Sequence, residues 1–169
     1  MTLAQTLANY GEYHRDRRNV LTHAVGVPMI VLAIDVLLAR PVFMVPLLGV
    51  AATPALIVNV LAAVWYLQLD TKAGLMMTVL LALFYAVGVQ IAAVSTTAWI
   101  GGGIGLFVVG WAFQFLGHHW EGRKPAFVDD LRGLLHGPLF MAVEGLWALG
   151  LAKGLKAEVH SLMEPQPAE

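Results

Sequence analysis

The sequence predicts an all-α protein, a polytopic membrane helical bundle with about four transmembrane helices and a short interfacial or half-inserted C-terminal helix. Of its 169 residues, 59% are hydrophobic and 12% are charged, and the mean hydropathy is +0.73. A soluble domain carries roughly one-quarter charged residues. Uncharged stretches approach or exceed the roughly 20 residues that a helix needs to cross a bilayer. Because no linker-like stretch divides the chain, we expect residues 1–169 to form a single integral-membrane domain.

The first half of the chain predicts two spans. Residues 20–39 form the first uncharged stretch apart from Asp35 and His23. Residues 41–69 form the second, in which Pro46 and Pro54 could kink the helix or mark a later start.

The second half predicts two more spans and a shorter helix. Residues 73–117 carry no charge and are too long for one span, so we expect two helices that turn near residues 95–97. Residues 137–151 are too few to cross and include Glu144, which favours an interfacial or half-inserted helix. A polar C-terminal tail at residues 152–169 is expected to follow.

The distribution of basic residues predicts the orientation. Segments 1–19, 118–136 and 152–169 are expected on the cytoplasmic side, because cytoplasmic segments are enriched in Lys and Arg. With both termini there, the residues on that side are Arg15, Arg17, Arg18, Lys72, Arg123, Lys124, Arg132, Lys153 and Lys156. Arg40 alone falls on the other side. No small-residue cleavage site follows the first apolar run, which is therefore expected to be retained as an anchor.

Composition also limits the partners. The formal net charge is −1, which argues against a nucleic-acid partner, so membrane lipids are the expected surroundings. The alanine-rich composition favours a bacterial inner membrane over an endoplasmic reticulum. The chain has no cysteine, so a metal site would use nitrogen and oxygen ligands. The sequence does not predict an oligomeric state.

The first polar cluster lies between Tyr13 and His23. His23 follows His14 by nine positions, and an unbroken helix would place them on opposite faces and about 13 Å apart along its axis. They converge only if the chain bends, and Asn19 could cap a helix that begins near Val20. Juxtamembrane Arg and His also commonly lie among lipid headgroups, and spacing alone favours that interpretation.

The second polar cluster lies between Gln114 and Lys124. His118 and Glu121 share a helical face, whereas His119 points elsewhere. A histidine nitrogen and a carboxylate oxygen together suit iron, manganese or zinc. The end of a membrane helix is also an ordinary place for such residues, so the cluster alone leaves both hypotheses open. An even number of crossings puts both clusters on one membrane face, where they could form a single metal site.

The remaining polar residues are weaker candidates. Asp35 and Glu144 are expected to face the bundle interior, to pair with a neighbour or to lie near an interface. His136 precedes a helix start, and His160 is expected in solvent.

Together the two clusters resemble the 2-hydroxy fatty acid dioxygenase family. The resemblance covers nearly the whole chain, and its motifs are Tyr13-His14, Asn19, His23, Gly26-Val27-Pro28, Gln114-Phe115-Leu116-Gly117-His118, Glu121 and Pro125-Ala126. It implies an Fe(2+)-dependent α-oxidation in which a 2-hydroxy fatty acid and O2 give a fatty acid one carbon shorter and CO2. The histidines that matter in the family correspond to His14, His23 and His118.

This resemblance leads to a specific hypothesis for the site. His14, His23 and His118 are expected as catalytic iron ligands, with Glu121 as a fourth ligand or as a residue that orients them. The residues expected to hold the substrate are Asn19, Arg17, Arg18, Arg123 and Lys124. Two alternatives are a non-enzymatic transporter or scaffold, and a lipid hydrolase that holds zinc in the same pocket.

Overall fold

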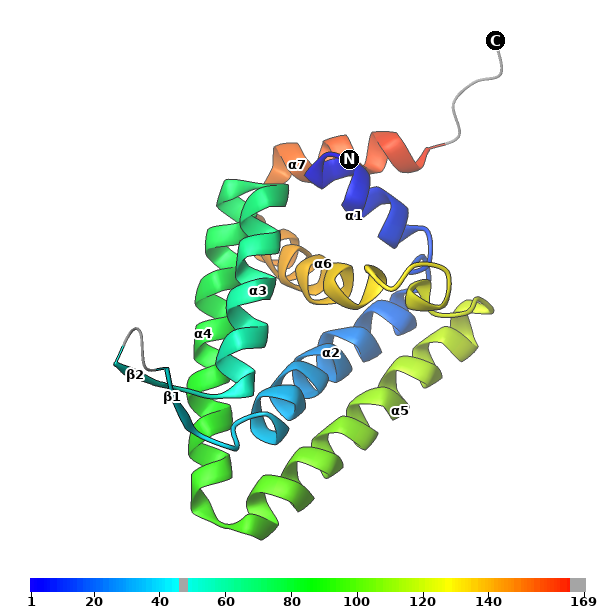
Figure 1. Cartoon of the computed structure of the whole chain (residues 1–169). Helices are drawn as coiled ribbons and strands as arrows, with labels where there is room; N and C mark the ends of the chain where they lie inside the picture. The colour runs from blue at the N-terminus through cyan, green and yellow to red at the C-terminus, as the bar shows by residue number, and fades with distance from the viewer. Residues whose placement is uncertain (46–48, 165–169) are drawn as a thin grey trace. The chain divides into compact units, whose positions relative to one another are not determined.

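The fold is helical, as predicted, and the computed structural model describes residues 1–45 and 49–164 (Figure 1). Within these ranges it contains seven α-helices and one two-stranded hairpin. The chain divides into two compact units, one formed by residues 1–24 and 113–169 and the other by residues 25–112. Each unit is described separately below.

In the part of the chain that the structure describes, three helices are long and apolar enough to cross a membrane. They are α2 (Arg17–Leu37), α4 (Thr71–Val94) and the continuous helical segment Ala98–Glu121, which includes α5 (Gly103–Glu121). A fourth arises if α6 (Gly133–Ala148) and α7 (Lys153–Met163), which are bent by 119° at their junction, count as one span. Large apolar side chains are exposed along α4, as lipid-facing positions would be: Leu75, Val79, Leu83 and Val87.

Of the alternatives left open for residues 41–69, the structure shows a later helix start, at Pro54. The first part of this stretch forms strands β1 (Phe43–Val45) and β2 (Val50–Ala52), which pair antiparallel with Met44 opposite Ala51. The helix, α3, begins only at Pro54 and ends at Leu69. Thr53 caps it by accepting a hydrogen bond from the Leu56 amide, and a proline is favoured in a first helical turn. Pro46 lies outside the described residues.

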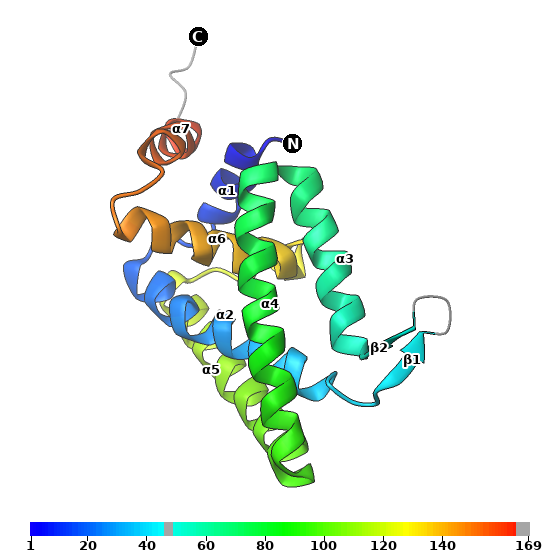
Figure 2. The same cartoon turned by 90° about the vertical axis from the view of Figure 1, so that its left-hand side faces the viewer.

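Helices α3 and α4 form a tight helical hairpin (Figure 2). Asp70 separates them and caps α4 by accepting a hydrogen bond from the Ala73 amide at 2.8 Å. Gly74 permits the close approach, because a Cβ there would lie 2.5 Å from the Leu67 Cα. In the same unit Asp35 is buried and accepts a hydrogen bond from Asn59 at 2.5 Å, which confirms the interior pairing expected of it.

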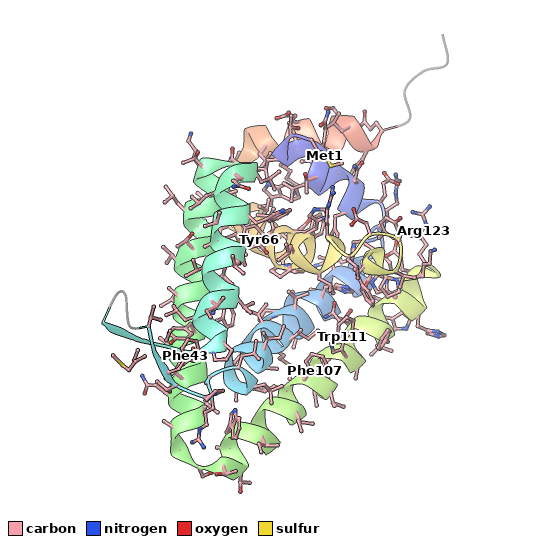
Figure 3. All side chains as sticks on the ribbon, viewed as in Figure 1. Met1, Phe43, Tyr66, Phe107, Trp111 and Arg123 are labelled. Carbon is pink, nitrogen blue, oxygen red and sulfur yellow. The ribbon has the colours of Figure 1, made fainter. Side chains whose placement is uncertain are left out.

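The predicted turn near residues 95–97 is confirmed. Helix α4 ends at Val94, Ser95 is extended, and a π-helical turn, η1 (Ala98–Gly102), leads into α5. On α5 the Phe107 and Trp111 rings lie one turn apart, with centroids separated by 6.1 Å (Figure 3).

The unit that contains both chain ends is built around α1 (Leu3–Gly11), which contacts α6 and α7 (Figure 1). Thr2 and Gln5 form a capping box at the start of α1. Helix α6 begins at Gly133, earlier than the expected residue 137, after the short 3-10 helix η2 (Ala126–Val128). The segment predicted as a polar tail contains α7, whose Val159 is fully buried. Polar and apolar residues alternate in this segment, so the apolar face of the helix was not predicted from the sequence.

Candidate metal centre

A sharp bend between α1 and α2 brings the first polar cluster together. The expected cap at Asn19 is wrong, because Asp16 accepts a hydrogen bond from the Arg18 amide at 2.8 Å and α2 begins at Arg17. Asn19 therefore lies inside the first turn, fully buried, and donates to the Tyr13 carbonyl at 3.0 Å. His14 occupies the bend itself, so it escapes the helical spacing that would hold it away from His23.

His14, His23 and His118 converge in the described part of the chain. One ligand nitrogen from each lies within 4.8 Å of the others. The ring centroids are 4.4 Å apart for His14 and His23, 5.2 Å for His14 and His118, and 4.9 Å for His23 and His118. The two polar clusters thus meet, and we call these three side chains the histidine triad.

Backbone carbonyls fix the tautomers of two triad members. His14 Nδ1 lies 2.9 Å from the Tyr10 carbonyl oxygen, and His23 Nδ1 lies 3.0 Å from the Asn19 carbonyl oxygen. A carbonyl only accepts, so each Nδ1 carries the proton and donates it. The lone pair of each Nε2 is then available to a metal, an arrangement that is usual for metal-binding histidine.

The triad is buried, and burial keeps His14 neutral. His14, His23 and His118 are 5%, 2% and 6% exposed. Burial lowers the pKa of His14 to about 4. The neighbouring His118 acts in the same direction, whereas the hydrogen bond that His14 donates to the Tyr10 carbonyl and the charge of Glu121 raise the pKa. At neutral pH the His14 imidazole is therefore an uncharged ligand rather than a cation.

Two ring nitrogens of the triad also indicate that it suits a metal ion. His14 Nε2 and His118 Nδ1 are buried and have no hydrogen-bond partner within residues 1–45 and 49–164. A buried polar atom left without a partner costs about 1–3 kcal/mol. A cation bound at the triad would give unpartnered nitrogens a ligand bond, and imidazole suits iron, zinc, copper and nickel.

Residues around the triad hold its rings in place. The Tyr10 ring stacks on His14, with centroids 4.3 Å apart and planes 14° from parallel. Gly117 precedes His118 and faces α2 so closely that a Cβ there would clash with Asn19 Oδ1 and Thr22 Oγ1. The absence of a side chain at Gly117 therefore allows α5 to present His118 to the other two histidines.

Glu121 lies outside the group of potential metal ligands and anchors the start of α2. Its carboxylate accepts hydrogen bonds from the amides of Arg15 and Asp16, each at 2.9 Å, and from the Asn19 side chain at 3.0 Å. The positive end of the α2 helix dipole also stabilises a carboxylate at this position. Of the two roles expected of Glu121, these contacts support orientation rather than ligation. His119 is exposed and also lies outside the group.

Most of the basic residues predicted to bind substrate already have contacts. Arg18 pairs with Asp16 at 2.7 Å, and Lys124 pairs with Asp129 at 2.5 Å. Arg123 donates to the Glu12 carbonyl at 2.7 Å. Arg17 is exposed in the first turn of α2, and Asn19, as described above, lies beside the triad.

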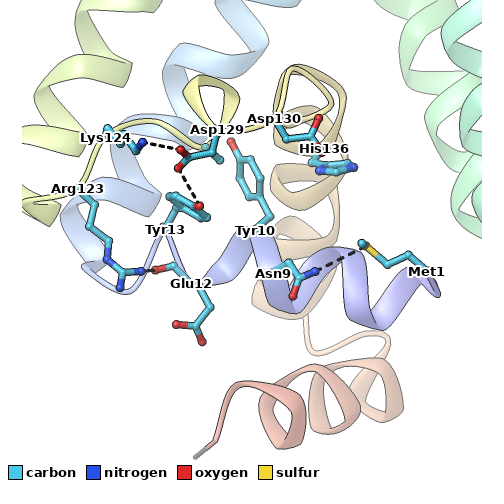
Figure 4. Close-up of a pocket in the computed structure, with 12 residues that line it drawn as sticks. Met1, Asn9, Tyr10, Glu12, Tyr13, Arg123, Lys124, Asp129, Asp130 and His136 are labelled. Carbon is cyan, nitrogen blue, oxygen red and sulfur yellow. Dashed lines mark hydrogen bonds and ion pairs between the residues drawn. The ribbon is translucent and has the colours of Figure 1, made fainter.

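Arg123 and Lys124 line a cavity of about 690 Å³, which we call the polar cavity (Figure 4). Tyr10, Tyr13 and Asp129 also line it, and its wall contains no member of the triad. The Lys124 ammonium lowers the pKa of Asp129 through their hydrogen bond. This cavity therefore does not bring the predicted cations to the histidines.

The surroundings of the site also include Tyr10 and Trp147, which were not predicted, and Gln114, which was named only as part of a motif and given no role. Tyr10 and Gln114 each precede a triad histidine by four residues, a spacing that puts side chains on one helical face and was the available signal. Gln114 is 5% exposed, and its Nε2 has no hydrogen-bond partner. Trp147 is 7% exposed and carries an unpartnered Nε1, but nothing in the sequence near it indicated a role.

Comparison with known proteins shows similarity over nearly the whole chain. Residues 1–147 match the family model described as 2-hydroxy-palmitic acid dioxygenase Mpo1-like. The chain is 32% identical over 166 residues to the 2-hydroxy-palmitic acid dioxygenase MPO1 of Saccharomyces cerevisiae, an alignment that covers 97% of this chain and 91% of the yeast protein. No solved structure matches. With its family motifs folded into one buried histidine triad, the chain belongs to the 2-hydroxy-palmitic acid dioxygenase Mpo1-like family.

Proposed function

We propose that this protein is an Fe(2+)-dependent dioxygenase that converts a 2-hydroxy fatty acid and O2 into a fatty acid one carbon shorter and CO2. The observation that carries the proposal is the histidine triad, whose ligand nitrogens lie within 4.8 Å of one another in a buried site. The yeast relative's name supplies the substrate class and the use of dioxygen.

The proposed reaction balances without another reductant. R–CH(OH)–COOH and O2 give R–COOH, CO2 and H2O. The bond between C1 and C2 breaks, C1 leaves as CO2, and C2 becomes the new carboxyl carbon. The substrate loses four electrons, and O2 accepts them. This balance favours a 2-hydroxy acid over an unsubstituted fatty acid, which would need further oxidation at C2.

The proposed roles of the protein residues follow from their contacts. His14, His23 and His118 would hold the iron, and the bound iron would supply the coordination and one-electron chemistry that activate dioxygen. The carbonyls of Tyr10 and Asn19 keep the Nδ1 protons of His14 and His23 in place. Glu121 fixes the bend that carries His14 and the turn that carries Asn19. The buried setting limits access of water to the reacting atoms.

Metal analysis combined with turnover tests this proposal. The full chain is purified in detergent and loaded with Fe(2+) without oxygen, and bound metal is measured. Air-saturated buffer and a 2-hydroxy fatty acid are then added. We expect one iron per chain, and equal amounts of O2 consumed, CO2 released and shortened acid formed.

Histidine variants provide the matched comparison. His14→Ala, His23→Ala and His118→Ala should each abolish iron binding or turnover, because each removes a triad ligand. His119→Ala should leave both unchanged, because His119 is exposed and next to His118. A folded protein that binds no metal would refute the proposal. Zinc binding with ester or amide hydrolysis and no oxygen uptake would favour a zinc hydrolase, since a three-histidine site also suits catalytic zinc.

A further inference from the structure

A second cavity in the unit formed by the chain ends includes a triad member in its wall. It has a volume of about 330 Å³, lies among α1, α6 and α7, and is lined by His14 together with apolar and polar side chains. We call it the His14 cavity. Its volume is at the lower end of the range for small-molecule sites. The larger polar cavity lacks any triad residue, so the His14 cavity is the better candidate for reaching the metal centre.

The apolar part of the wall suits the first carbons of an acyl chain. Phe140, Val159 and Met163 line it, and Val159 is fully buried. The Phe140 ring joins the two ends of the wall, because its centroid lies 5.7 Å from His14 and 6.5 Å from Trp147. A ligand that packs on Phe140 would therefore also approach His14.

Trp147 gives the cavity a buried hydrogen-bond donor without an acceptor. The side chain is 7% exposed, it lines the cavity, and Nε1 has no hydrogen-bond partner among the described residues. Its ring is held by Lys156, whose Nζ lies 5.7 Å from the ring centroid, and by an edge contact with His160 at 6.3 Å. Buried indole N–H groups usually have a partner. A bound molecule with an oxygen acceptor would supply one.

The charged groups on the wall match a molecule that both donates and accepts hydrogen bonds. Arg15 contributes positive charge, although Glu12 pairs with it at 2.6 Å, and Glu144 contributes a half-buried carboxyl group. A 2-hydroxy acid has a carboxylate that accepts hydrogen bonds and a hydroxyl that donates one. The carboxylate suits Trp147 Nε1 and Arg15, whereas the hydroxyl suits Glu144. An unsubstituted fatty acid would leave Glu144 without that donor.

We propose that the His14 cavity is the binding site of the 2-hydroxy acid head group, with Trp147 Nε1 donating a hydrogen bond to a substrate oxygen. The proposal rests on the function proposed above and names the site that delivers the substrate to the triad. The acyl chain beyond its first carbons extends out of the cavity, because the volume is too small for a long chain.

Photo-crosslinking locates the head group without relying on turnover. A 2-hydroxy fatty acid that carries a diazirine close to C2 is irradiated with the full-length protein in detergent, and labelled peptides are identified by mass spectrometry. We expect labels in α6 and α7, removed by excess 2-hydroxy acid and less well by an unsubstituted fatty acid of equal length. Labels confined to residues 123–130 of the polar cavity, or spread over α4, would overturn the proposal.

One glycine variant tests the cavity by filling it, and a second glycine variant serves as its control. A Cβ on Gly11 would lie 3.0 Å from Met163 Sδ and 3.6 Å from Phe140 Cε2, so Gly11→Leu grows toward residues of the wall. A Cβ on Gly145 meets nothing within 4 Å, so Gly145→Leu is the matched control on α6. We expect Gly11→Leu to raise KM or weaken crosslinking at least about 10-fold with iron content unchanged. Gly145→Leu should behave as wild type.

Trp147→Phe tests the donor while keeping an aromatic ring, and it protects the test if Gly11→Leu does not fold. It should raise KM about 10-fold and leave iron content near wild type, because the donor N–H is lost while an aromatic ring remains in the wall. The smaller ring is expected to lower thermal stability, because Trp147 is buried. A wild-type KM in both Trp147→Phe and folded Gly11→Leu would refute the His14 cavity. If the wild-type protein neither binds iron nor turns over the substrate, the proposed function is refuted. Crosslinking would then still show whether the ligand occupies the His14 cavity.

Discussion

Glu121 shows how a residue outside the triad controls its geometry. Its carboxylate accepts from two backbone amides at the α1–α2 bend and from Asn19, whose carbonyl in turn accepts from His23. Hydrogen bonds to a charged group are stronger than those between neutral groups. Replacing the carboxylate should therefore loosen both the bend and the His23 ring.

We predict that Glu121→Gln lowers iron affinity roughly 10- to 100-fold while the protein stays folded, the usual effect of losing a residue that orients metal ligands. Competition with a chelator measures this affinity. Glu12→Gln is the control, because Glu12 makes a solvent-exposed pair with Arg15. An unchanged affinity in Glu121→Gln would show that the carboxylate does not orient the triad.

Gln114, in contrast to Glu121, is a buried side chain whose amide nitrogen makes no hydrogen bond within the described residues. Its Nε2 has no hydrogen-bond partner, and it lies one helical turn before His118. We predict that Gln114→Leu keeps or raises the free energy of unfolding by about 1 kcal/mol, because it removes an unpartnered buried donor. Denaturant or thermal unfolding in detergent measures the change. A loss of more than about 1 kcal/mol would mean that the amide is bonded to ordered water.

At the scale of elements, the contact between α2 and α5 depends on Gly117. We predict that Gly117→Ala abolishes stoichiometric iron binding, because the added methyl group collides with Asn19 and Thr22 and pushes His118 away. Gly105→Ala on the same helix meets nothing within 4 Å and should bind iron normally, with a slight gain in helix stability. Metal content after gel filtration compares the two. Equal iron content would refute the close-packing argument.

The meeting of the two clusters also constrains α3. The start of α2 and the end of α5 both contribute to the triad, so an even number of crossings must separate them. Helices α2 and α4 and the segment that includes α5 are long enough to cross, which makes three. We therefore predict that helix α3, with 16 residues and about 24 Å long, supplies the fourth crossing despite its short length.

Single cysteines test this crossing cleanly, because the chain has none of its own. With the N-terminus in the cytoplasm, Ser95→Cys should react with an impermeant maleimide from outside the cell. Thr71→Cys and Ser161→Cys should react only after permeabilisation. All three positions are exposed. Labelling of Thr71→Cys from outside the cell would contradict a crossing by α3. Labelling of Thr71→Cys and Ser95→Cys from the same side would contradict a crossing by α4.

For the whole molecule, a metal at the triad would link segments about one hundred residues apart in the chain. A ligand that binds only the folded state stabilises it by about 2.7 kcal/mol when present at 100 times its Kd. We predict that Fe(2+) raises the unfolding midpoint by about 5 °C or more, and that a chelator reverses the rise. His23→Ala should show no metal-dependent shift. An equal shift in that variant would mean that iron binds elsewhere.

Much of the fold is predictable because its causes are local. Runs of uncharged residues indicate α2, α4 and α5, and the break near Ser95 follows from the length limit of a span. The β1–β2 hairpin was not predicted, since its apolar residues do not differ in composition from those of a helix. Helix α7 was not predicted, because its apolar residues are buried only through contact with α1, which comes from the other end of the chain.

Composition and motifs are sufficient to predict a helical, apolar chain and to name its three motif histidines. The fold was needed to find that Glu121 accepts hydrogen bonds from the α1–α2 bend, that Lys124 is already paired, and that Trp147 lines a cavity beside His14. The reason is physical: helix formation and membrane insertion depend on neighbouring residues, whereas the partners of a carboxylate, an ammonium or an indole N–H come from segments far away in the chain.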